Sequence, residues 1–291
     1  MSFRFAWALP LLLQIPLCGA QTITLNLGAE QLVHQGAKLG VGAAQELEAA
    51  VENNPEDLSA RAKLVGYYFY QWMQPGEAAA KAARRRHILW LIENHPDVQL
   101  TGLSEAVIDR SGNSLADEEG YEQARKLWLA HLDSPKTGAQ ALGNLAKFFQ
   151  MTDKNLAEKA LLRALELQPT NGEWNWRLGY LYAMGILGVD AIGLNGQPTS
   201  TDPFAQQSPF AAKARKALAE TTNGTTLAIA ASILWRYGTM LAPSEKMKAE
   251  YVDQAIQFVQ QARKAEPANP SWPQFLAQLQ AYRRQVLSPP N

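Results

Sequence analysis

Side chains that could carry out acid–base or metal chemistry are few in this chain, and their spacing fits neither role. The four histidines are His34, His87, His95 and His131. His87 and His95 fall on one expected helix but stand eight residues apart, about two turns, whereas two metal ligands on a helix prefer a spacing of three or four together with a third ligand. We therefore expect surface or capping histidines and no metal site.

The charged clusters also lack the pattern of a catalytic centre. The run Arg84–His87 would fan over more than half the circumference of a helix, which predicts a solvated face and leaves a local anionic contact open. The pairs Glu56-Asp57 and Glu118-Glu119 fall in turns or at expected helix starts, where they favour the helix dipole. Neither G-x-S-x-G nor S-x-x-K occurs. We predict no catalytic residue and no enzymatic activity.

Two short motifs are weak indications of function, because each also fits an ordinary helix start or end. Gly40-Val-Gly42 supplies the first two glycines of a dinucleotide fingerprint, but Gln45 stands at the third position and no apolar strand precedes it. A flexible helix start is expected there, with no cofactor. Asn223-Gly-Thr225 is a glycosylation acceptor if the host glycosylates, and it also fits a helix end followed by a cap.

Length and composition indicate a folded protein. The 291 residues suffice for one elongated array or two compact domains. The contents of 47% hydrophobic and 19% charged residues are ordinary for a folded protein and argue against disorder. The formal net charge of 0 gives no indication of a nucleic-acid partner.

The first twenty residues, 1–20, have the composition of a secretory signal peptide. Arg4 provides the positive start, Phe5 to Leu17 is mostly apolar, and Cys18-Gly-Ala supplies small residues at the cleavage site. The apolar run is shorter than the roughly 20 residues that a membrane span needs. We expect cleavage after Ala20, export to the periplasm or medium, and no stable membrane span afterwards.

Cys18 is the only cysteine. A lipoprotein anchor on Cys18 is the alternative, which the large Leu17 before it disfavours. If residues 1–20 are removed, no disulfide, cysteine-based zinc site or thiol nucleophile remains.

The elements that organise the chain are clearest between Asn155 and Gly188. Apolar residues at helical spacing predict helices over 155–168 and 173–187, with Asp153 or Asn155 as the first cap. Pro169 would end the first helix, and the following Thr-Asn-Gly is typical of a turn.

Three segments share one spacing, in which residues follow one another at intervals of four, three and five and end in proline. These sets are Ala157, Leu161, Ala164 and Pro169; Ala43, Leu47, Ala50 and Pro55; and Ala255, Val259, Ala262 and Pro267. With Leu178-Gly179 followed by Tyr182, the pattern resembles the tetratricopeptide repeat over most of 40–287. The resemblance implies an all-α, right-handed α-solenoid of antiparallel helix hairpins, of about five units.

The remaining chain divides around these repeats. A lead-in over 21–39 includes a short strand or extended stretch at 22–27, and a polar connection over 97–119 holds one short helix near 103–109. An inserted loop spans 188–209 and a tail spans 288–291. Further helices are expected over 40–54, 59–73, 77–94, 121–133, 137–152, 210–222, 225–241, 244–265 and 271–287.

The resemblance also implies where a partner would bind. In this family the concave groove is lined mainly by the first helix of each unit, and matching positions fall on Gln140, Asn144, Lys147, Phe148, Glu173, Trp176, Tyr180, Ala183 and Met184. The peptide-binding residues implied are Asn144, Lys147, Trp176, Tyr180 and Met184, because large aromatic side chains are good anchors for a peptide. Asn144 and Lys147 resemble the family's carboxylate-binding residues, although the fuller basic set is missing. The alternative is that Trp176 and Tyr180 pack against the inserted loop or a neighbouring helix.

The function implied is that of an exported scaffold that binds a peptide or protein partner in its groove. The alternative is a structural subunit of a cell-envelope or secretion assembly that uses the outer surfaces. The oligomeric state stays open.

Overall fold

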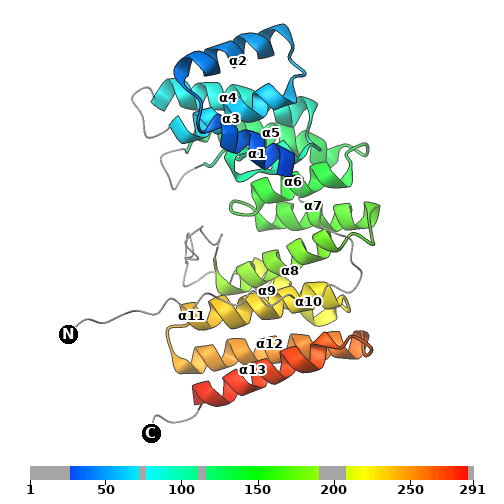
Figure 1. Ribbon diagram of the computed structural model, residues 1–291. Helices are drawn as coiled ribbons and strands as arrows, with labels where there is room; N and C mark the ends of the chain where they lie inside the picture. Colours follow the sequence, from blue (N-terminus) through cyan, green and yellow to red (C-terminus); the bar gives the residue numbers. More distant parts are fainter. Residues whose placement is uncertain (1–26, 72–76, 111–115, 190–207, 288–291) are drawn as a thin grey trace, which may run out of the picture.

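The computed structural model describes residues 27–71, 77–110, 116–189 and 208–287, and this part of the chain is all-helical (Figure 1). The expected signal peptide, most of the inserted loop 188–209 and the tail lie outside these residues. The α-helices are α1 Leu27–Gly36, α2 Val41–Asn53, α3 Leu58–Tyr70, α4 Glu77–Asn94, α5 Glu118–Asp133, α6 Ala139–Phe149, α7 Lys154–Leu167, α8 Gly172–Leu187, α9 Pro209–Glu220, α10 Gly224–Ile233, α11 Thr239–Leu241, α12 Glu245–Ala265 and α13 Ser271–Leu287. Two short 3-10 helices, η2 Gln99–Gly102 and η3 Ser104–Ala106, separate α4 from α5, and a π-helical turn, η5 Leu234–Gly238, joins α10 to α11.

Prolines mark the helix ends as the sequence predicts. One stands two residues beyond the last residue of each of α2, α4, α5, α7 and α12, namely Pro55, Pro96, Pro135, Pro169 and Pro267. Proline lacks an N–H and disfavours helical geometry in the residue before it, so each helix stops there. The starts are capped by short polar side chains: Asp153 accepts from two backbone N–H groups of α7, and Asn223 caps α10.

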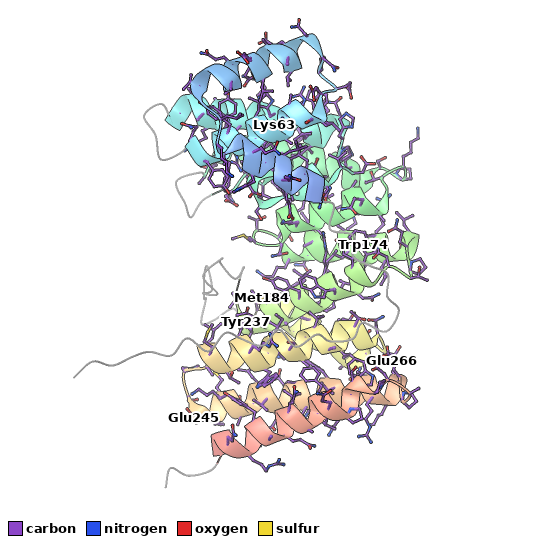
Figure 2. The ribbon with its side chains drawn as sticks, viewed as in Figure 1. Lys63, Trp174, Met184, Tyr237, Glu245 and Glu266 are labelled. Carbon is purple, nitrogen blue, oxygen red and sulfur yellow. The ribbon has the colours of Figure 1, made fainter. Side chains whose placement is uncertain are left out.

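Apart from α1, which packs against α3, the helices from α2 to α13 are stacked along the long axis of the molecule (Figure 1). α3 packs on α4, α6 on α7, α8 on α9 and α10, α10 on α12, and α12 on α13. One apolar core runs through the stack from Val33 in α1 to Leu279 in α13. Trp174 of α8, labelled in Figure 2, is fully buried in it. A smaller cluster lies between α2 and α3.

Two glycines allow geometry that no other residue would. A methyl group at Gly179 would lie 2.5 Å from the carbonyl oxygen of Thr226, so α8 and α10 approach backbone to backbone, in agreement with the predicted role of small residues. Gly188 has a φ of 69° and ends α8 in the left-handed conformation.

The lead-in contains a helix that the sequence pattern does not predict. α1 begins at Leu27, where an extended stretch is expected; residues 22–26 lie outside the described part. α1 lies directly against α3, because Gly66 faces the backbone of Val33, while Gly36 faces the backbone of Lys63, too closely for any side chain. This reciprocal contact holds a short helix of only 10 residues in place.

The prediction of a polar connection over 97–119 is also wrong for its first half, which is apolar and buried. Leu100, Leu103, Ala106 and Ile108 are buried in the main core. The short helix expected near 103–109 is present as the 3-10 helix η3, a second one, η2, precedes it, and the segment packs between α3, α4 and α6. Its apolar residues therefore belong to the core, although they lack a helical period.

The prediction of a solvated face for Arg84–His87 is wrong as well. Arg84 is 2% exposed and His87 is 1% exposed. Arg85 makes two hydrogen bonds of 2.7 Å to the carboxylate of Asp117. Arg86 alone is largely exposed, and it too pairs with a carboxylate from another helix, that of Glu48, at 2.8 Å. The anionic contacts that the sequence leaves open are therefore formed by Arg85 and Arg86.

Candidate functional site

A groove opens between α6 and α8, with α7 as its floor. Both α6 and α8 pack on α7, and they meet each other where Trp174 of α8 lies against Gly143 of α6. The cavity measures about 300 Å³, the lower end of the roughly 300–1,000 Å³ typical of ligand sites. We call it the aromatic groove, and its residues are Ala146, Lys147, Gln150, Ala157, Leu161, Trp176, Arg177, Tyr180 and Leu181.

Two stacked rings form the wall of the aromatic groove on α8. Trp176 and Tyr180 stand one turn apart, with ring centroids 5.6 Å apart and planes 12° from parallel. Trp176 remains 44% exposed, an unusual position for so large an apolar side chain. Ala157 and Leu161 of α7 are buried beneath them. The groove thus offers a flat aromatic surface above an apolar floor.

Positive charge borders the same groove. Arg177 is held by hydrogen bonds to the Gly143 carbonyl oxygen, at 2.8 Å, and to Glu173, at 2.6 Å. Lys147 on α6 is half-buried, and its ammonium makes no hydrogen bond or ion pair with any residue that the structure describes. Burial, and next the charge of Arg177, lowers the pKa of Lys147.

Of the five implied peptide-binding residues, the structure brings Lys147, Trp176 and Tyr180 together in this groove. Asn144 is buried instead, and its amide donates to the carbonyl oxygens of Pro96 and Val98, at 2.8 and 3.0 Å. Met184 is fully buried, because α9 and α10 cover the second half of α8.

The sequence argument misses Gln150 and Arg177, which also line the groove. Both lie one helical turn or one residue from a predicted position: Gln150 follows Lys147 by three residues, and Arg177 follows Trp176. The helical period places Gln150 and Arg177 beside predicted positions, so it could have indicated them. The positions implied by the family resemblance instead include Asn144 and Met184, which are buried.

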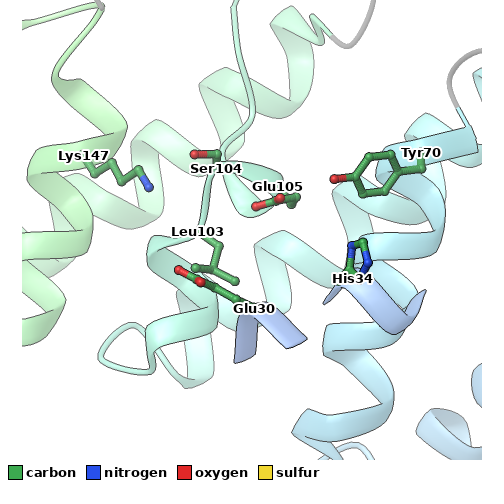
Figure 3. A pocket seen from close by; sticks show the side chains of 7 residues that line it. All are labelled: Glu30, His34, Tyr70, Leu103, Ser104, Glu105 and Lys147. Atoms are coloured by element: carbon green, nitrogen blue, oxygen red, sulfur yellow. The ribbon is translucent and has the colours of Figure 1, made fainter. Parts of the chain in front are cut away.

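A second cavity, of about 340 Å³, lies where α1, α3, η3 and α6 meet (Figure 3). We call it the polar cavity. Its residues are Glu30, His34, Tyr70, Leu103, Ser104, Glu105 and Lys147, so Lys147 lines both cavities. Burial, and next the carboxylate of Glu105, raises the pKa of Tyr70.

Buried Arg84 fixes the floor of the polar cavity. Its guanidinium donates to the Glu105 carbonyl oxygen, at 3.0 and 2.7 Å, and to that of Val107, at 2.6 Å. Burial lowers the pKa of Arg84 to about 10. Asn144 anchors the start of the same segment, at Pro96 and Val98. Segment 96–107 is therefore held at both ends by side chains from its neighbouring helices.

A buried hydrogen-bond network ties α2, α3 and α4 together beside this cavity. Arg61 can only donate, so its contact of 3.2 Å makes Nδ1 of His87 an acceptor. Nε2–H of His87 then donates to Glu48, at 3.0 Å, and the Tyr68 hydroxyl donates to the same oxygen, at 2.6 Å. Burial lowers the pKa of His87, which keeps the ring neutral. The network joins three helices and does not open into either cavity.

The described residues contain neither a cluster of metal-binding side chains nor a membrane-spanning helix. No three His, Cys, Asp or Glu side chains lie together there in a way that could hold a metal ion. No helix within the same ranges is long and apolar enough to cross a bilayer. Comparison with protein-family models, with curated proteins and with solved structures finds no match for this chain.

Proposed function

We propose that this chain is a non-catalytic scaffold that binds an extended peptide or protein segment in the aromatic groove. The observation that carries the proposal is the pair Trp176 and Tyr180, stacked and open to solvent on one side above the apolar floor of α7. A peptide side chain placed on these rings would bury apolar surface on both partners. Polar atoms of Gln150 and the ammonium of Lys147 stand at the rim, where they can meet the peptide backbone or a carboxylate.

The proposed architecture is a right-handed solenoid of the tetratricopeptide type. The pairs α3–α4, α6–α7, α8–α9 and α10–α12 would be four of its hairpins, since the helices of each pair pack on each other. A fifth unit would span 97–133, with η2 and η3 in place of its first helix and α5 as its second. In such an array α6 and α8 are first helices, so the aromatic groove would belong to the concave face.

The proposal includes export, supported by the signal-like segment 1–20. An aromatic anchor surface with few fixed polar contacts suits a peptide that is held mainly by one apolar side chain.

The test selects random dodecapeptides on the purified protein by phage display and measures their affinity by fluorescence anisotropy. Trp176→Ala and Tyr180→Ala should each weaken binding about tenfold or more, the effect of losing an interface anchor worth at least 1.4 kcal/mol. Leu167→Ala is the matched control, because Leu167 is 51% exposed on α7 and lies outside the groove.

If the selected peptides bind Trp176→Ala as tightly as the parent protein, while circular dichroism shows an unchanged fold, the groove is not the binding surface. Weakened binding to Leu167→Ala would instead favour an assembly that uses the outer surfaces.

A further inference from the structure

The polar cavity holds charges that the rest of the described chain leaves unpaired. Lys147 enters from α6, Glu30 from α1 and Glu105 from η3. None of these three side chains forms a hydrogen bond or ion pair with another described residue. The same holds for the side chains of His34 and Ser104. Most of these side chains are exposed, whereas Lys147 and Glu105 are half-buried, so the space is open to a ligand from solvent. In ligand pockets a small number of convergent polar groups fixes the orientation of the ligand.

The charges are near enough to act on one another but do not touch. The carboxylates of Glu105 and Glu30 both favour the charged form of Lys147 through space. Figure 3 shows the ammonium of Lys147 pointing from one side toward Ser104 and Glu105, and the hydroxyl of Tyr70 pointing into the same space from the other. The space between these groups therefore has a positive wall and a negative wall.

Neither a simple anion nor a simple cation suits both walls. An anion near Lys147 would face two carboxylates, and a cation near Glu30 and Glu105 would face the ammonium. A ligand that carries both charges meets an opposite charge on each side. The two carboxylates do not make a metal site either, because no described cluster has three suitable ligands.

We propose that the polar cavity binds a small zwitterion, with the ligand's carboxylate at Lys147 and its ammonium between Glu30 and Glu105. A volume of about 340 Å³ suits a free α-amino acid or a short peptide with both termini unblocked. The hydroxyl groups of Ser104 and Tyr70 lie where they can hydrogen-bond to the ligand. This site is additional to the aromatic groove and does not depend on it, although the two share Lys147.

The test titrates the whole protein by calorimetry with defined probes. The probes are the twenty free amino acids, trialanine, N-acetyl-trialanine and trialanine amide. At least one unblocked zwitterion should bind at millimolar concentration or below. Binding by amino acids alone assigns the site to them, and binding by trialanine assigns it to peptides, whose N-acetylated and amidated forms should bind at least tenfold more weakly.

Variants then place the ligand. Glu105→Gln and Lys147→Gln should each weaken binding at least tenfold, and Lys147→Arg should restore most of it. Glu118→Gln is the matched control, because the side chain of Glu118 is 74% exposed on α5, away from the cavity. Trp176→Ala should leave zwitterion binding unchanged.

Three outcomes overturn the proposal. They are the absence of binding by every zwitterion, equal binding of the blocked forms, and loss of binding in Trp176→Ala with retention in Glu105→Gln. The last would move the ligand into the aromatic groove, so a failure here is separable from a failure of the peptide groove.

Discussion

The amino-terminal helices α2 to α5 and the carboxy-terminal helices α8 to α12 are held together by different forces. Between α2 and α5 the buried positions include Arg61, Arg84 and His87, each bonded to a polar group from another element. Between α8 and α12 the buried positions are mainly apolar, with large side chains such as Leu178 and Met184, and Gly179 meets the backbone of α10. The amino-terminal end therefore depends more on directed hydrogen bonds of buried charged side chains and the carboxy-terminal end more on apolar packing, while close backbone approach occurs at both, as at Gly66 and Gly179.

This difference explains where each cavity lies. A directed bond can hold an irregular segment, as Arg84 holds η3, and the segment then leaves a space lined by polar groups. A regular helix such as α8 buries one apolar side and leaves the residues beyond that side exposed or half-buried. Trp176 and Tyr180 stand on this solvent-facing side of α8, where they line the aromatic groove.

The largest effect is expected where a directed bond is lost. Arg84→Met keeps an unbranched apolar side chain but removes the guanidinium and leaves the carbonyl oxygens of Glu105 and Val107 unpaired, at about 1–3 kcal/mol for each. Urea unfolding followed by circular dichroism measures the change in the free energy of unfolding. Arg86→Met is the control, because Arg86 is 62% exposed and its pair with Glu48 is worth only about 0–1 kcal/mol. Equal losses in the two variants would show that directed bonds do not dominate this end.

A smaller effect is expected at the carboxy-terminal end. Gly179→Ala puts a methyl group against the Thr226 carbonyl oxygen and should cost about 1–3 kcal/mol through overpacking. Gly42→Ala in α2 is the matched control. No atom lies within 4 Å of its added methyl group, and alanine is favoured over glycine in a helix by about 0.5–1 kcal/mol. The thermal midpoint should fall for the first variant and rise for the second, and a rise for both would mean that α8 and α10 can separate without cost.

The smallest effect depends on pH and is specific to the amino-terminal end. The folded-state pKa of His87 lies below 6.5, so in acid the unfolded chain takes up a proton that the folded chain refuses. The free energy of unfolding should therefore fall as the pH drops below 6.5, by at most about 1.4 kcal/mol per pH unit. Glu48, Arg61, Tyr68 and Arg86 are the ionisable groups that face the ring.

His87→Gln removes this proton-linked term, so its stability should vary less with pH between 6.5 and 5 than that of the parent protein. Chemical unfolding at several pH values compares the two slopes. Parallel curves would mean that His87 takes up protons equally in both states.

Most helices could be predicted because residues at or next to their ends determine where they begin and stop. Pro96 ends α4 and Pro169 ends α7 where the spacing predicts, and Asp153 caps α7 from the adjacent residue. α1 could not be predicted in this way, because its position depends on contacts with α3, which is distant in the sequence: Val33 meets Gly66, and Gly36 meets Lys63. No local pattern distinguishes such a helix from an extended stretch.

The candidate sites also divide into features that the local sequence predicts and features that depend on the tertiary fold. Trp176 and Tyr180 lie on one helix at a spacing that places them on one face, so their pairing could be expected. The burial of Arg84 could not, because the carbonyl oxygens that receive it come from a segment without helical period. The polar cavity draws residues from position 30 to position 147, and only the tertiary fold brings these together.

Lys147 belongs to both cavities, and this gives the two a thermodynamic connection. A ligand whose carboxylate pairs with this ammonium in one cavity neutralises the charge that a ligand in the other would use. Linkage requires the resulting loss of affinity to be the same in both directions. A groove peptide with an acidic side chain at Lys147 and a zwitterion in the polar cavity would therefore act as mutual antagonists without touching, whereas a peptide without that acid would leave the second ligand's affinity unaltered.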